Sequence, residues 1–320
     1  MSVVKLSASP VPAPTLTLDE VVRELQYLPS APRVLPRLKQ LLCDGNTAMN
    51  EVVEMVRLDP GIAARVLQFG NSAHFSQGLR CYTVEEAVNR VGYDQIYELV
   101  ATAVASQVLV RPLASYSLEA DALWENSIAC ALAAEALSRH VGTDQNISYT
   151  VGLLHSVGMV AIDDWVSRNR PMLRFIDKGL PLESCEQERA LLGFHQAEAG
   201  AGLLRAWEFP PVMFEPVRWQ YLPNGTAVHF KLAALLHVAK WLRTAVLHPM
   251  VERSRPHEGL LNRLQLTNRQ LDQLVEEVGL RFKRINIELE DTTPTVSLRF
   301  PGGERQIAQG FSADFDGKLD

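Results

Sequence analysis

The sequence predicts an all-α protein built from two helical lobes. Apolar residues recur at helical spacing from about residue 18 to 292, and the alternating patterns typical of strands are scarce. Capping residues and glycine or proline stops divide this pattern into separate helices. The chain has 320 residues, 47% of them hydrophobic, and is therefore long enough for two lobes that each bury a core.

The first lobe is predicted as a series of short helices. Apolar spacing indicates helices at 34–42 and 50–58. Asp59 followed by Pro60 is typical of an N-cap and a first helical position, so another helix should start there and stop near Gly70.

A second capping pattern lies further along the same lobe. Thr83 and Glu86 form a predicted capping box, in which Thr83 accepts an amide of the first turn and Glu86 reaches back. Its helix should end at Gly92, and a longer helix is expected over about 94–110, before Pro112.

The second lobe should follow a connector at 111–120. A long helix is predicted over 123–142, with Gly142 at its C-terminal cap. Further helices are expected at 147–166, 183–191, 196–207, 227–247 and 267–284. The predicted organisation is a flexible arm at 1–17, a first lobe at 18–112, a second lobe at 113–292 and a flexible tail at 293–320.

Composition, charge and hydropathy argue against several classes of function. The net charge of −6, without a long basic run, disfavours indiscriminate binding to nucleic acid. The N-terminus lacks the pattern of a signal peptide, and no apolar stretch reaches the ~18 residues that a membrane span needs. The four cysteines are dispersed, which indicates structural thiols in a reducing compartment. We therefore expect a cytoplasmic protein that does not enter a membrane.

The stretch GLLHSVGMV at 152–160 raises the question of chemistry. His155 lies in an apolar run on a predicted helix, where a lone histidine is usually a core residue bonded to a carbonyl. A catalytic divalent metal needs at least three protein ligands from several helices. His195, just before the helix at 196–207, is the next candidate, but no histidines are spaced i,i+4 and no HExxH motif occurs.

Several segments follow one another in an order typical of one bacterial family. They are YLPSAPRVLPRL (27–38), VRLDPGIAARVLQFGNSAHF (56–75), TVEEAVNRVGYDQIYELV (83–100), WENS (124–127), GLLHSVG (152–158), GFHQAEAGAGLLRAWEFPP (193–211) and HVAKWL (237–242). Together they resemble the HDOD family, a branch of the HD phosphohydrolase superfamily found in bacterial signalling proteins. The resemblance covers about 20–285 and implies an N-terminal helical lobe packed on an HD-like helical bundle.

The same resemblance implies a metal site whose ligands this chain has largely lost. HD hydrolases bind metal through an early His, an adjacent His-Asp pair, further histidines and a late Asp. The corresponding residues here are Asn126, His155, Ser156, His195, Trp219 and Lys240. Ser156 offers a neutral hydroxyl where a hard cation prefers a carboxylate, and Lys240 would add a positive charge. We interpret these residues as a vestigial pocket that holds no metal or other cofactor and performs no catalysis.

The resulting expectation is a non-enzymatic bacterial signal-transduction protein, a pseudoenzyme that binds partner proteins in trans. The groove between the lobes is the expected docking place, with a small ligand as an additional occupant. The alternative is an active metal-dependent phosphohydrolase or phosphodiesterase acting on a nucleotide or cyclic dinucleotide. A third hypothesis is a nucleic-acid-associated regulator. The missing ligands count against the alternative, and the acidic net charge counts against the third hypothesis.

Overall fold

A computed structural model of the chain is all-α, which confirms the predicted fold class. The structure describes residues 16–25, 34–43, 47–76, 78–92, 95–96, 112–175, 181–223 and 228–290. Regular structure in these ranges is helical, apart from an isolated bridge between Leu113 and Leu118. No helix in the same ranges is long and apolar enough to cross a membrane. The predicted arm, the predicted tail and the expected helix at 94–110 lie almost entirely outside the described residues.

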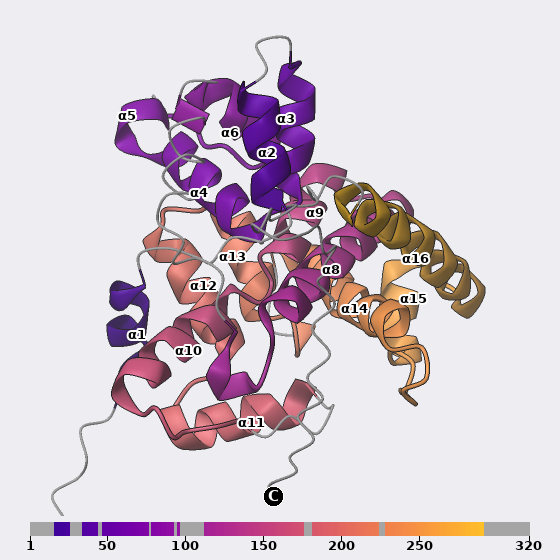
Figure 1. Cartoon of the computed structure of the whole chain (residues 1–320). Helices are drawn as coiled ribbons and strands as arrows, with labels where there is room; N and C mark the ends of the chain where they lie inside the picture. Colours follow the sequence, from indigo (N-terminus) through magenta and orange to yellow (C-terminus); the bar gives the residue numbers. More distant parts are fainter. Residues whose placement is uncertain are drawn as a thin grey trace, which may run out of the picture.

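The first part of the chain forms short helices. They are α1 (Leu18–Glu24), α2 (Val34–Cys43), α3 (Met49–Arg57), α4 (Pro60–Asn71), α5 (Ala73–Ser76) and α6 (Val84–Val91). Helices α2 to α6 gather at one end of the molecule (Figure 1), where α4 packs on α6 and α3 contacts α2, α4 and α6. This group, which falls within the range 18–112 predicted for the first lobe, is called the first lobe below.

The two predicted caps of this lobe are present. Oδ1 of Asp59 accepts the backbone N–H of Ile62 at 2.9 Å. Oγ1 of Thr83 accepts the backbone N–H of Glu86 at 3.2 Å, but the Glu86 carboxylate accepts the N–H of Tyr82, at 2.7 Å, instead of that of Thr83. The second capping box is therefore displaced by one residue, and both caps satisfy amides that the first turn leaves unpaired.

The rest of the chain forms a larger helical lobe. Its elements are η1 (Ala114–Tyr116), α8 (Ala120–Val141), α9 (Gln145–Leu153), α10 (Val157–Asn169), α11 (Pro181–Leu192), α12 (Gln196–Ala206), α13 (Pro211–Arg218), α14 (Phe230–Leu247), α15 (Glu258–Leu264) and α16 (Asn268–Glu290). Helix α8 lies at the centre and packs against α9, α14 and α16 (Figure 1). It ends at Gly142, whose φ of 70° confirms the predicted cap. Helices α13 and α15 were not predicted.

Helix α1 lies on the larger lobe although it comes first in the sequence (Figure 1). It packs against α12 and α10. Side-chain atoms of Val22 and Leu18 stand 3.3 and 3.4 Å from where a Cβ on Gly202 would be. The missing side chain on α12 therefore lets α1 approach closely, and its contacts group it with the second lobe instead of the first.

Arg57, at the end of α3, joins the two lobes. Its guanidinium pairs with Glu85 of α6 at 2.8 Å and with Glu135 of α8 at 3.0 Å. It also lies 4.3 Å from the ring centroid of Tyr149 on α9, whose hydroxyl donates to the Arg57 carbonyl at 2.9 Å. One side chain thus connects helices of both lobes around a half-buried set of charges.

Candidate functional site

The segment around His155 is a turn, so the continuous helix predicted over 147–166 is wrong. Helix α9 gives way to α10 through a turn at 154–156. Nδ1 of His155 lies 2.7 Å from the carbonyl oxygen of Gly152. In an uninterrupted helix that oxygen would accept the backbone N–H of Ser156. The imidazole thus replaces a helix hydrogen bond, which the spacing of apolar residues could not reveal.

Two glycines, Gly152 and Gly158, flank this turn and let neighbouring helices approach it closely. A Cβ on Gly152 would lie 2.8 Å from Cα of Ala131 on α8, and a Cβ on Gly158 would lie 1.8 Å from the carbonyl oxygen of Gln196 on α12. The backbones of α9 and α10 therefore touch those of α8 and α12. This packing fixes the position of His155 between them.

The second ring nitrogen of His155 is bound by Arg243, a residue that the sequence analysis missed. Nη1 of Arg243 on α14 lies 3.1 Å from Nε2. Because the Gly152 carbonyl can only accept, Nδ1 carries the ring proton and Nε2 accepts from the guanidinium. Burial lowers the pKa of His155 well below its ordinary value, and the charges of Arg243 and Lys240 lower it further. His155 is therefore a neutral imidazole with both nitrogens engaged.

The side chains of Ser156 and Asn126 bond to different partners instead of to each other. Oγ of Ser156 lies 3.3 Å from Oγ of Ser127 on α8. The amide of Asn126 instead donates to the carbonyl of Ala122, one turn back on the same helix, at 2.7 Å. Ser127 is therefore the residue of α8 in contact with the turn, and the contact consists of two neutral hydroxyls.

His195 caps α12. Its Nδ1 accepts the backbone N–H of Glu198 at 3.3 Å, and the Glu198 carboxylate accepts the N–H of His195 at 3.1 Å. Burial lowers the pKa of His195, with smaller effects in the same direction from Arg189 and Lys240. The imidazole stands edge-on to Tyr221, with ring centroids 6.1 Å apart. The geometry gives Nδ1 a structural hydrogen bond at the start of the helix.

Lys240 lies close to both imidazoles. Its Nζ is 3.1 Å from the ring centroid of Tyr221, the same ring that contacts His195. The residue is only 7% exposed. Burial lowers the pKa of Lys240 well below its ordinary value, and Arg243 lowers it further. Arg243 lies three residues after Lys240 on α14, so i,i+3 spacing was the signal that could have identified it.

Gln220, and not the predicted Trp219, contacts the turn at 154–156. The Gln220 amide donates to the carbonyl of His155 at 2.9 Å. The Trp219 ring instead lies 5.5 Å from the guanidinium carbon of Arg218. The predicted site residue was therefore one position away from the residue that contacts His155.

A buried acid, Glu188 on α11, completes this interior region and was also missed. Its Oε1 accepts from the hydroxyl of Tyr116 at 2.7 Å, and its Oε2 accepts the N–H of Gln196 at 2.6 Å. Burial raises the pKa of Glu188 to about 7, against the opposing effects of these hydrogen bonds and of Lys240. Tyr116 is 72 residues away in the sequence, so no local pattern could have paired the two.

These donors do not fit a divalent metal ion. Nε2 of His155 accepts from Arg243, and Nδ1 of His195 accepts a backbone amide. Lys240 and Arg243 bring positive charge to the region where a cation would need anionic oxygens. Within the described ranges, no group of three or more His, Cys, Asp or Glu side chains is placed to hold a metal.

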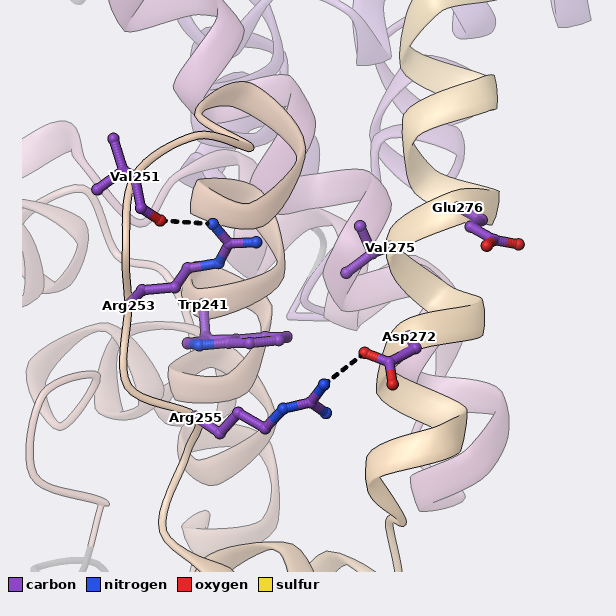
Figure 2. A pocket seen from close by; sticks show the side chains of 7 residues that line it. All are labelled: Trp241, Val251, Arg253, Arg255, Asp272, Val275 and Glu276. Carbon is purple, nitrogen blue, oxygen red and sulfur yellow. Dashed lines mark hydrogen bonds and ion pairs between the residues drawn. The ribbon is translucent and has the colours of Figure 1, made fainter.

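A separate pocket of about 450 Å³ lies between α14, the segment that follows it, and α16. Figure 2 shows the Trp241 ring between Arg253 and Arg255, whose guanidinium carbons lie 5.5 and 5.9 Å from the ring centroid. Arg255 pairs with Asp272 on α16 at 2.8 Å. The indole faces are thus covered by guanidinium groups, and the pocket presents no free aromatic platform for a base.

Comparison with known proteins supports the resemblance seen in the motifs. The HDOD domain profile matches residues 28–223, which is more than half of the chain. The chain belongs to the HDOD domain family. Its first lobe and the part of its second lobe that contains His155, His195 and Gln220 lie within the matched HDOD region.

Solved structures share the fold of this chain. The MmoQ response regulator from Methylococcus capsulatus matches with a TM-score of 0.62 and 21% identity, over 79% of this chain and 99% of that one. A virulence factor from Campylobacter jejuni matches with a TM-score of 0.59 and 18% identity, over 86% of this chain and 94% of that one. At these identities the similarity shows a common fold.

One further match comes from sequence comparison alone. An uncharacterized protein of Treponema pallidum is 25% identical over 210 residues, which is 64% of this chain and 40% of that protein. The chain therefore spans about two fifths of the length of this relative.

Proposed function

We propose that this HDOD protein is a non-enzymatic signal-transduction protein that acts in trans by binding other signalling proteins in the bacterial cytoplasm. The observation that carries the proposal is the contact between Nη1 of Arg243 and Nε2 of His155, at 3.1 Å. A metal-dependent hydrolase uses such an imidazole lone pair as a ligand, whereas here the lone pair accepts from a permanent cation.

The proposed loss of catalysis is supported by the side chains that stand where metal ligands would be needed. In metal-dependent hydrolases the ion lowers the pKa of a bound water from 15.7 to about 7 and so supplies hydroxide at neutral pH. The described residues around His155 lack the carboxylates that would hold such an ion, and Lys240 and Arg243 repel it. A signalling role is supported by the shared fold with a protein described as a response regulator.

The catalytic half of the proposal is tested by metal analysis and a hydrolysis assay with added Mn²⁺. We expect the purified wild-type chain to retain no stoichiometric metal and to hydrolyse neither a model phosphodiester nor a cyclic dinucleotide. The triple variant Ser156→Asp, Lys240→Asp, Arg243→Ala restores two carboxylates and frees Nε2, so Mn²⁺ affinity should appear in it alone. A near-stoichiometric metal in the wild type, with turnover lost in His155→Ala, would overturn the proposal in favour of a phosphohydrolase.

The signalling half is tested by cross-linking in native host cells, capture of the chain and mass spectrometry. We expect one signalling protein to be captured reproducibly and its activity to change when the purified, metal-free chain is added. The His155→Ala variant should have the same effect, provided that it is folded. An effect that depends on turnover, or no effect at all on the captured protein, would contradict the proposal.

A further inference from the structure

Four buried polar atoms near His155 make no hydrogen bond within the described part of the chain. They are Nζ of Lys240, Nε of Arg243, Oε1 of Gln196 and Oε1 of Gln220. Buried polar groups in proteins are almost always satisfied by protein, water or ligand. Four unsatisfied atoms in one region therefore indicate that something binds there.

The two cationic side chains project into the same region. Lys240 and Arg243 are three residues apart on α14 and so share a face of that helix. Nζ of Lys240 lies 3.1 Å from the ring centroid of Tyr221, and Nη1 of Arg243 lies 3.1 Å from Nε2 of His155. Arg243 and Tyr221 are partly exposed, whereas Lys240 and His155 are buried.

The two amides belong to the same region. Gln196 donates to the hydroxyl of Tyr221, and Gln220 donates to the carbonyl of His155 at 2.9 Å. Their unpaired oxygens need hydrogen-bond donors, while the two cations need acceptors. The occupant must therefore offer both, with negative charge.

The nearby acid does not neutralise the cations. Glu188 uses one oxygen to accept from Tyr116 and the other to accept from Gln196. Nζ of Lys240 makes no hydrogen bond to Glu188 or to any other group in the described residues. Burial lowers the pKa of Lys240, so the positive charge of the region rests first on the guanidinium of Arg243, and a bound anion would favour the protonated form of Lys240.

We propose that Lys240 and Arg243 bind a compact oxyanion of the phosphate class in this interior region. A monoprotonated phosphate group offers several acceptor oxygens for the two cations and a hydroxyl for a glutamine oxygen. The inference rests on the proposed function, because an anion held by two cations presupposes that no metal occupies the same place. Phosphate itself and the phosphoryl group of a nucleotide share this chemistry.

The test is isothermal titration calorimetry of the full-length chain, after its metal content has been measured. Inorganic phosphate is the ligand in one arm and adenosine monophosphate in the other. We expect saturable phosphate binding that weakens about tenfold to hundredfold in Lys240→Met and in Arg243→Met. Lys231→Met, which removes an exposed charge from the same helix, should bind like the wild type. Tighter binding of the nucleotide than of phosphate would identify a larger ligand that carries the phosphoryl group.

Folding is checked separately for each variant by thermal unfolding without phosphate. Lys240→Met removes a buried amine that makes no hydrogen bond in the described residues, so it should unfold at the same or a higher temperature than the wild type. If a metal-free wild type binds neither probe, or if folded Lys240→Met binds phosphate as the wild type does, the anion site is wrong while the proposed function stands. A stoichiometric metal in the wild type would instead overturn both.

Discussion

Nη1 of Arg243 lies 3.1 Å from Nε2 of His155 and holds the imidazole in one tautomer. The opposite nitrogen donates to the carbonyl of Gly152 at 2.7 Å. Because a guanidinium stays charged at any pH at which the protein folds, it opposes protonation of the ring as effectively as it opposes a metal ion. The pair therefore links the chemistry of the site to the stability of the fold.

The first prediction concerns the pH dependence of stability. The pKa of His155 is well below 6.5 in the folded chain and close to 6.5 in the unfolded chain. As pH falls below about 6.5, the unfolded state takes up a proton that the folded state does not, so stability should fall by up to about 1.4 kcal/mol per pH unit. His155→Asn keeps a donor for the Gly152 carbonyl but cannot titrate. Its free energy of unfolding should therefore fall less steeply with falling pH than that of the wild type.

Urea unfolding of both proteins between about pH 7.5 and pH 5 measures the difference. Other partly buried histidines whose pKa is lowered, such as His195 and His237, contribute equally to both proteins and cancel. Parallel stability curves for wild type and variant would show that His155 is not the titrating group.

Features encoded locally were predictable from the sequence. The cap at Asp59 and the stop at Gly142 depend on a side chain and its neighbours within one turn, and both are confirmed. The turn at 154–156 was not predictable, because it depends on an imidazole replacing a backbone donor. The pattern of apolar residues is the same on both sides of that break, so periodicity gave one helix in place of two.

The candidate site was predictable only in part, because its contacts also depend on structure that is not encoded locally. His155 and Lys240 were expected in one interior region and both are near Arg243. Ser127 and Gln220 replaced the neighbouring residues Asn126 and Trp219, since the direction of a side chain depends on packing between helices. The contacts that decide the chemistry join positions far apart in the chain, which motif spacing does not encode.

The second prediction has the opposite pH dependence. The pKa of the Glu188 carboxyl is about 7 in the folded chain, against 4.5 for an unperturbed glutamate. Between these values the folded state binds the extra proton, so this group lowers stability as pH rises from about 4.5 to about 7, by about 3 kcal/mol in total. Glu188→Gln remains neutral and should escape that loss.

Chemical unfolding measures the free energy of unfolding of both proteins. The value for Glu188→Gln minus that for the wild type should be larger at about pH 8 than at about pH 4.5. The glutamine oxygen can still accept the N–H of Gln196, and its amide can face the hydroxyl of Tyr116. A difference between the two proteins that does not change with pH would mean that folding does not raise the pKa of Glu188.

The third prediction concerns the connection between the lobes. Arg57→Met removes the pairs with Glu85 and Glu135 and leaves Glu135, which is only 14% exposed, with Arg281. Breaking a mostly buried pair costs about 3 kcal/mol of unfolding free energy. Thermal or urea unfolding should show that loss.

The matched control is Arg139→Met, which breaks the pair between Arg139 and Glu277. Those side chains are 45% and 39% exposed, so the loss should stay below about 1 kcal/mol. Equal losses in the two variants would show that Arg57 contributes no more than a surface charge.

The last prediction concerns the backbone contact that positions the turn. A Cβ on Gly158 would lie 1.8 Å from the carbonyl oxygen of Gln196 and 2.5 Å from the backbone N of Gly200. Both obstacles are main-chain atoms of α12, so the helices must separate, and Gly158→Ala should cost about 3 kcal/mol or prevent folding. Gly279→Ala on α16 is the control, because a Cβ there meets nothing within 4 Å among the described residues and should stabilise the helix by roughly 0.4–1 kcal/mol. Unfolding midpoints that move in opposite directions are expected, and a Gly158→Ala variant as stable as the wild type would show that α10 and α12 do not pack backbone to backbone.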